Sequence, residues 1–128
     1  LGEFVVNTVP QELAAQMNLT SSSTQVSEFD LASLESAPSR WIATPRVARS
    51  PVSLECKVIS HYPLKDGAGQ AVGSHLLIAE VIGVGIDEHL IVDGTFSWGE
   101  TRTVVRAGGV ADYHWIGQDN LLQMVRPR

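Results

Sequence analysis

The sequence predicts a mainly β fold with short helices, because strand-like segments dominate and do not alternate regularly with long helices. Residues 52–61 alternate between apolar side chains on one face and Ser, Glu and Lys on the other, as in a half-buried strand. Residues 75–86 are too rich in Ile and Val to favour a helix. The order of these elements differs from the βαβ repeat that builds a parallel sheet.

The N-terminal third carries one further strand and the two predicted helices. Phe and two Val residues predict a strand over residues 3–8. Pro10 suits the first turn of a helix over residues 11–18, whose apolar residues share one stripe. Residues 27–30 have the form of a capping box, in which the Ser27 hydroxyl accepts a backbone N–H. A short helix over residues 28–34 is expected to follow.

Turn-forming residues divide the C-terminal half into short pieces. A glycine-containing turn is predicted at residues 65–70, between the two long strands. The chain is then expected to turn at residues 87–88 and to return as a strand over residues 89–93. Asp93-Gly94 is a further turn signal, and a short C-terminal helix is expected around Asn120.

Length and charge restrict the class of protein. The 128 residues correspond to one domain, over residues 1–128. A net charge of −5 and scattered Lys and Arg residues argue against a nucleic-acid partner, which requires a basic face. No apolar run reaches the roughly 18 residues that a membrane-spanning helix needs, so no membrane partner is predicted.

Cysteine and histidine usage indicates neither a disulfide nor a metal site. Cys56 has no second cysteine to pair with, which is consistent with a reducing compartment, and we expect a cytoplasmic protein. Cys56 also falls on the apolar side of its strand and is predicted to be an inert core thiol. The four histidines are too far apart in the sequence to suggest a cluster of metal ligands.

Gly73-Ser74-His75 is the segment most suggestive of chemistry. Two small residues lead into a strand, and the sequence predicts His75 at the mouth of that strand. A histidine there is able to donate to an anionic or carbonyl group, or to act as an acid. A solvated strand-end histidine is the competing interpretation. Tyr113 and its aromatic neighbours are suited to packing either on a flat ring or at a subunit interface.

Taken together, the segments resemble the flavin reductase-like family, which includes flavoredoxins and the reductase components of two-component monooxygenases. The similarity lies in the order and spacing of several motifs. These are GEFVVN at residues 2–7, the helix at residues 11–18, SEFD at 27–30, SPVSLEC at 50–56, GSHLLIAEV at 73–81, and Arg106-Ala107-Gly108-Gly109 followed by Tyr113.

The resemblance implies a split β-barrel of the FMN-binding type, usually a homodimer with the flavin near the subunit interface. It implies FMN as cofactor, with FAD as an alternative, and reduction of the flavin by NADH or NADPH. It also implies a flavin acceptor such as a partner monooxygenase. The alternatives are a flavin-binding electron carrier without free turnover, or an inactive truncated fragment.

The resemblance also assigns site residues. His75 matches the histidine that is linked to the nicotinamide substrate, and Ser74 stands where many family reductases carry Asp. The cofactor-binding positions implied by the motifs are Asn7, Thr8, Ser27, Glu28, Phe29 and Tyr113. No metal ligand is implied.

The resemblance begins within the family's domain rather than at its start. Members carry several strands before the segment that matches residues 2–7, and those strands make most of the contacts to the flavin phosphate. We therefore expect a split barrel that is incomplete at its N-terminus, with residues 1–128 forming the C-terminal part of the domain, and weak flavin affinity for these residues alone.

Overall fold

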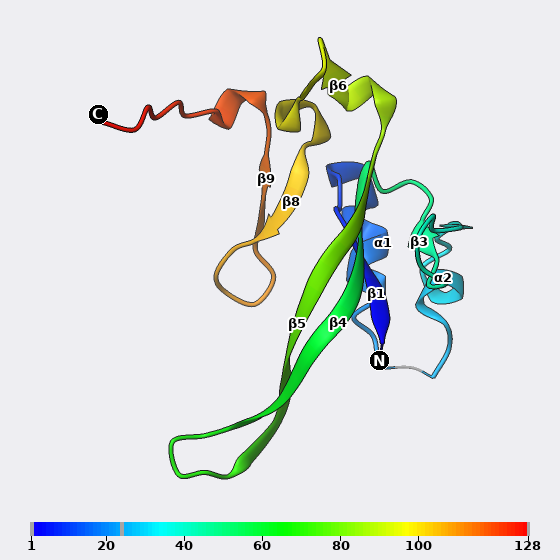
Figure 1. The fold of residues 1–128 in the computed structure, drawn as a ribbon, viewed down its shortest axis with the longest axis vertical. Helices are drawn as coiled ribbons and strands as arrows, with labels where there is room; N and C mark the ends of the chain where they lie inside the picture. The colour runs from blue at the N-terminus through cyan, green and yellow to red at the C-terminus, as the bar shows by residue number, and fades with distance from the viewer. Residues whose placement is uncertain (1, 24, 128) are drawn as a thin grey trace.

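The computed structural model describes residues 2–23 and 25–127, and the fold is mainly β with short helices. Figure 1 shows the arrangement of these elements. The strands are β1 (Glu3–Asn7), β2 (Ser36–Ala37), β3 (Arg46–Val47), β4 (Val52–Lys65), β5 (Ala71–Ile86), β6 (Ile91–Val92), β7 (Thr95–Phe96), β8 (Thr103–Arg106) and β9 (Tyr113–Ile116). The α-helices are α1 (Ala14–Leu19) and α2 (Glu28–Leu31), and 3-10 turns span Gln11–Leu13, Glu88–Leu90, Trp98–Thr101 and Gln118–Asn120.

An antiparallel sheet in the order β1-β4-β5 forms the centre of the fold. β1 pairs with the first part of β4, from Asn7 opposite Ser53 to Glu3 opposite Lys57. β4 and β5 form a long twisted hairpin whose closed end projects away from the other elements (Figure 1). The shorter strands pair as β2-β3, β6-β7 and β8-β9.

The two long strands are confirmed and extend beyond their predicted ends. β4 continues past residue 61 to Lys65 and includes Pro63, and β5 begins at Ala71. The register shifts between Pro63 and Lys65, which accommodates a residue that has no N–H to donate. The connecting turn is also confirmed, because Asp66 Oδ1 accepts the N–H groups of Ala68 and Gln70, each at 2.9 Å.

The first predicted helix is confirmed, whereas the capping box is wrong. A 3-10 turn over Gln11–Leu13 runs into α1, and Leu13 is buried. Ser27 stands before α2 but makes no side-chain hydrogen bond to it. α2 has a single turn and ends before residue 34, because Ser33 adopts a left-handed φ of 50°. Ser27 and Glu28 at the start of this one-turn helix are exposed, so water is able to accept its first N–H groups.

The predicted strand over residues 89–93 is wrong in its first half. Glu88–Leu90 forms a 3-10 turn that places the fully buried Leu90 in the interior, and extended structure is limited to β6. The turn at Asp93-Gly94 is confirmed. Both residues have positive φ, 50° and 73°, as a tight two-residue hairpin requires. The C-terminal helix around Asn120 is observed as a 3-10 turn.

The core lies where the first half of β4 meets β1 and the segments around it. Val52 and Cys56 of β4 are buried there, which confirms Cys56 as a core thiol. The outer part of the β4-β5 hairpin, by contrast, exposes large apolar side chains, among them Ile59, Tyr62, Leu64, Val72, Leu76, Leu77 and Ile78. Among the described residues, the helices are all too short or too polar to cross a bilayer.

Candidate functional site

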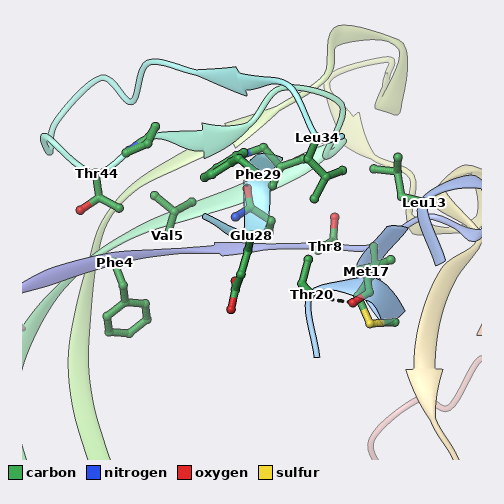
Figure 2. Close-up of a pocket in the computed structure, with 14 residues that line it drawn as sticks. Phe4, Val5, Thr8, Leu13, Met17, Thr20, Glu28, Phe29, Leu34 and Thr44 are labelled. Atoms are coloured by element: carbon green, nitrogen blue, oxygen red, sulfur yellow. Dashed lines mark hydrogen bonds between the residues drawn. The ribbon is translucent and has the colours of Figure 1, made fainter. Parts of the chain in front are cut away.

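A cavity of about 380 Å³ lies beside β1 and brings together four of the predicted site residues, Asn7, Thr8, Glu28 and Phe29. Figure 2 shows side chains from β1, α1, α2 and the segment before β3 around it, with Phe4 and Val5 on opposite sides of β1. The lining residues are Phe4, Val5, Asn7, Thr8, Val9, Leu13, Met17, Thr20, Glu28, Phe29, Leu34, Thr44, Pro45 and Val47. Sequence-distant segments therefore form one site around a single strand.

The lining of this cavity suits a flat, largely apolar ring. Phe4, Phe29 and Met17 supply aromatic and thioether surface, while Asn7 and Thr44 add polar groups at its edge. A volume of this size falls within the range of small-molecule sites, which combine mostly apolar walls with a few placed polar groups. Glu28 is exposed and contributes a carboxylate at the cavity's border.

One wall of the cavity is held in place by side chains of β1. We call residues 38–47 the wall segment, because its residues Thr44, Pro45 and Val47 line the cavity. Glu3 Oε1 accepts the backbone N–H groups of Ala43 and Thr44 at 2.8 and 2.9 Å. Asn7 Oδ1 accepts the Val47 N–H at 3.0 Å. Asn7 therefore holds the wall with its carbonyl oxygen, and its NH₂ group is left for other partners.

Glu55 of β4 fixes the beginning of the same wall segment. Its side chain is only 3% exposed, and its two oxygens accept the N–H groups of Arg40 and Trp41 at 2.9 and 2.8 Å. Burial by itself raises the pKa of this carboxyl, but the backbone N–H groups and the positive charge of Arg46 outweigh it, so the pKa lies below its ordinary value. The ionised carboxylate is thus the form that holds the segment.

Thr8 and Ser27, two of the predicted cofactor-binding residues, differ in how they relate to the cavity. The Thr8 hydroxyl donates to the backbone oxygen of Val52 at 3.2 Å, so its side chain also ties β1 to β4. Ser27 is exposed and does not belong to the lining. The SEFD motif therefore brings Glu28 and Phe29 to the cavity and leaves Ser27 outside it.

Tyr113 lies next to a second hollow of about 360 Å³, which it lines with Ala14, Met17 and Arg106. The Arg106 guanidinium stacks 4.8 Å from the centre of the Tyr113 ring. Met17 lines both hollows, so α1 separates Tyr113 from the cavity beside β1. The structure places Tyr113 near the candidate site but not in it.

His75 lies far from the cavity. It is the fifth residue of β5 rather than at the mouth of the strand, which corrects that expectation, and it is exposed opposite Pro63 of β4. Phe4 lies closest to His75 among the β1 residues that line the cavity: it pairs with Cys56, so seven residues of β4, or about 23 Å of strand, separate the levels of Phe4 and His75. One chain therefore does not bring His75 to the ligand of its own cavity.

The residues present fit a flavin ring better than they fit a flavin phosphate. Aromatic surface and hydrogen-bonding groups meet the needs of the ring, but none of the lining residues is Lys or Arg. Within residues 2–23 and 25–127, no group of three or more His, Cys, Asp or Glu residues is placed to hold a metal ion.

The sheet and the short helices define a mainly β protein, and the similar solved structures are split barrels. The profile of the flavin reductase like domain matches residues 1–101. The chain belongs to this family.

Relatives of known sequence or structure support the same assignment. An uncharacterized protein of Halalkalibacterium halodurans is 32% identical over 111 residues, 85% of this chain and 53% of its own length. Component B of nitrilotriacetate monooxygenase from Bacillus cereus has a TM-score of 0.80 at 27% identity, over 94% of this chain and 60% of that one. Flavoredoxin of Desulfovibrio vulgaris (Miyazaki F) shares the fold at 19% identity, with a TM-score of 0.76 over 96% of this chain and 62% of its own. The chain thus spans about half the length of the relatives that it matches by sequence.

Proposed function

We propose that the chain is part of an FMN-dependent NAD(P)H:flavin oxidoreductase. The observation that carries the proposal is the cavity beside β1, where Asn7, Thr8, Glu28 and Phe29 meet in a family whose members handle flavin. Flavin supplies hydride chemistry by itself, so the protein needs to bind and orient its ring rather than to provide a nucleophile. Residues 1–128 would then form the C-terminal part of the domain.

The proposed roles follow from the geometry. Phe29 and Met17 pack against the ring, and the free NH₂ group of Asn7 donates to a ring carbonyl. The wall segment, held by Glu3, Asn7 and Glu55, closes one side of the cavity. Ser27 and Tyr113 remain predicted cofactor contacts beyond the ring. We propose FMN rather than FAD as the cofactor, and both NADH and NADPH stay candidates for the reductant.

The proposed assembly is a homodimer in which each hairpin serves the other copy. His75 and the cavity lie too far apart along β4 to meet the same ring in one chain. The exposed apolar side chains of the outer hairpin supply surface for a second copy. In a two-fold dimer the hairpin of one copy then delivers His75 to the nicotinamide site of its partner.

Flavin retention and turnover test this proposal. We expect the protein to retain FMN through gel filtration and to oxidise NADH or NADPH above the free-flavin rate, followed at 340 nm. Retention of FMN without oxidation of either nucleotide would instead favour an electron carrier, for which Ser74 in place of the family's Asp is the motivating feature. Protein that takes up no flavin would contradict both functions.

Mixing two impaired variants tests the shared site. V5W fills the cavity of one copy, and H75A removes the histidine of the other. At nicotinamide concentrations far below KM, random exchange of subunits should restore about a quarter of the wild-type rate, because half of the dimers then hold one intact site. If the mixture is no faster than the separate variants while gel filtration confirms exchange, His75 does not act across the dimer.

A component B of a monooxygenase among the similar structures supports a further part of the proposal. The acceptor of the reduced flavin would be a partner monooxygenase. Co-purification or stimulated NAD(P)H oxidation on adding such a partner would test this, and an unchanged rate with every monooxygenase tried would leave free flavin as the acceptor.

A further inference from the structure

The outer hairpin carries a pair of histidines that the cavity does not explain. His61 Nε2 lies 2.8 Å from His75 Nδ1, and the ring centres are 4.8 Å apart with the planes tilted by 39°. His61 pairs with Leu77 and His75 with Pro63, so the two histidines are diagonal neighbours on one face of the hairpin. The contact is therefore a cross-strand hydrogen bond that the register of β4 and β5 sets.

Only one of the two ring nitrogens in this contact carries the shared proton, and imidazole chemistry favours one assignment. If His61 Nε2–H donates, both neutral rings keep their proton on Nε2, which is the tautomer that free histidine side chains prefer in water. The reverse arrangement needs the less favoured tautomer in both rings. With His61 as donor, His75 Nε2–H remains free to donate to a ligand.

We propose that His61 is a positioning residue for His75. Its Nε2–H donates to Nδ1 of His75, fixes the tautomer and orientation of that ring, and aims the His75 Nε2–H at an anionic or carbonyl oxygen of the nicotinamide dinucleotide. The proposal rests on the proposed function, in which His75 meets the nicotinamide substrate.

The surroundings of the pair explain why a positioning residue is useful there. Both histidines are exposed, and their neighbours on the same face, Pro63 and Leu77, have no side-chain hydrogen-bonding groups. Without His61 the His75 ring rotates among rotamers in solvent, so binding a ligand has to order it first. We expect H61A to raise the KM for the nicotinamide about three- to tenfold, the range that the loss of one hydrogen bond supports, with kcat changed less than twofold.

The first test is spectroscopic and independent of turnover. Nitrogen-15 NMR of the His75 ring distinguishes protonated from unprotonated ring nitrogens. In the wild-type protein we expect an unprotonated Nδ1 and a protonated Nε2, and in H61A both signals should move towards the average of a freely exchanging imidazole. Signals of His75 that are unchanged in H61A would overturn the proposal.

The second test is kinetic, with matched variants. H61Q places an amide N–H near the position of Nε2 and should recover most of the KM that H61A loses. H89A removes another exposed histidine, outside the hairpin, and should leave KM unchanged. H61A with wild-type KM would overturn the positioning role, even if the His75 signals respond.

H75A separates this proposal from the proposed function. If H75A raises KM but H61A does not, the nicotinamide role of His75 stands and the role of His61 is refuted. If H75A leaves KM unchanged, His75 does not contact the nicotinamide, and the positioning role falls with it. If KM is raised in both H75A and H61A and returns towards the wild-type value in H61Q, the nicotinamide role of His75 and the positioning role of His61 are both supported.

Discussion

Replacing Asn7 with Ala removes the oxygen that accepts the Val47 N–H at 3.0 Å and leaves that N–H without its partner. Asn7 and Val47 are both half-buried, so water compensates only part of the loss. We expect N7A to lower the free energy of unfolding by about 1–2 kcal/mol, the usual result of leaving a partly buried donor unpaired.

The same change should weaken flavin binding, because Val47 is part of the cavity wall. If the freed wall segment spends most of its time in a position that does not support the ligand, the apparent Kd for FMN rises by the inverse of the fraction that still supports it. A shift of about 0.7–1.4 kcal/mol corresponds to a rise of about three- to tenfold. Urea unfolding measures the first effect, and quenching of FMN fluorescence measures the second.

N7D is the control that separates the two roles of Asn7. A carboxylate still accepts the Val47 N–H, so stability should stay within about 0.5 kcal/mol of wild type. The NH₂ group is lost and a negative charge is added, so FMN affinity should still fall. Wild-type stability and wild-type FMN affinity in N7A would refute the reasoning, because the hydrogen bond to Val47 would then neither stabilise the fold nor fix the wall segment.

Three further predictions concern buried groups away from the exposed outer part of the hairpin. Glu55 has a lowered pKa in the folded protein, so its ionised form stabilises the fold above about pH 4.3, the pKa of an unfolded Glu, and this contribution is lost as the pH falls further. The difference in free energy of unfolding between wild type and E55Q should therefore shrink on acidification. A difference that does not depend on pH would contradict this. Cys56 is 3% exposed, so a thiol reagent should react with it only after denaturant is added, and rapid modification of the native protein would count against its place in the core. Leu90 is fully buried, so L90A should lower the free energy of unfolding by about 2–4 kcal/mol in urea titrations, and a loss below about 1 kcal/mol would mean that the site collapses around the smaller side chain.

The main strands were predictable because their side chains alternate or are strongly β-prone, whereas the errors arose where a long-range contact decides the conformation. Residues 89 and 90 were predicted to be extended, but they belong to a 3-10 turn over Glu88–Leu90 that buries Leu90. Ser27 has the right neighbours for a capping box, yet α2 is a single turn whose exposed first residues do not need one. The predicted strand 75–86 began too late, since pairing with β4 continues to Ala71.

Four of the fourteen residues that line the candidate site were predictable, and the anchoring of its wall was not. Motif similarity identified Asn7, Thr8, Glu28 and Phe29, which the fold gathers at one cavity. The sequence does not reveal that Glu3 and Glu55 hold residues 38–47, because those hydrogen bonds join backbone and side chains from 14 to 41 positions apart. Such contacts leave no local pattern of spacing.

The length of the β4-β5 hairpin has a consequence for how the rate should depend on protein concentration. Because about 23 Å of strand separates His75 from Phe4, the β1 residue of its own cavity nearest to it along the sheet, turnover in the proposed dimer is a property of the associated state. The specific rate should then decline on dilution below the dimer dissociation constant, while ring binding in the cavity declines less. In such a dimer the specific activity rises with the concentration of the protein itself.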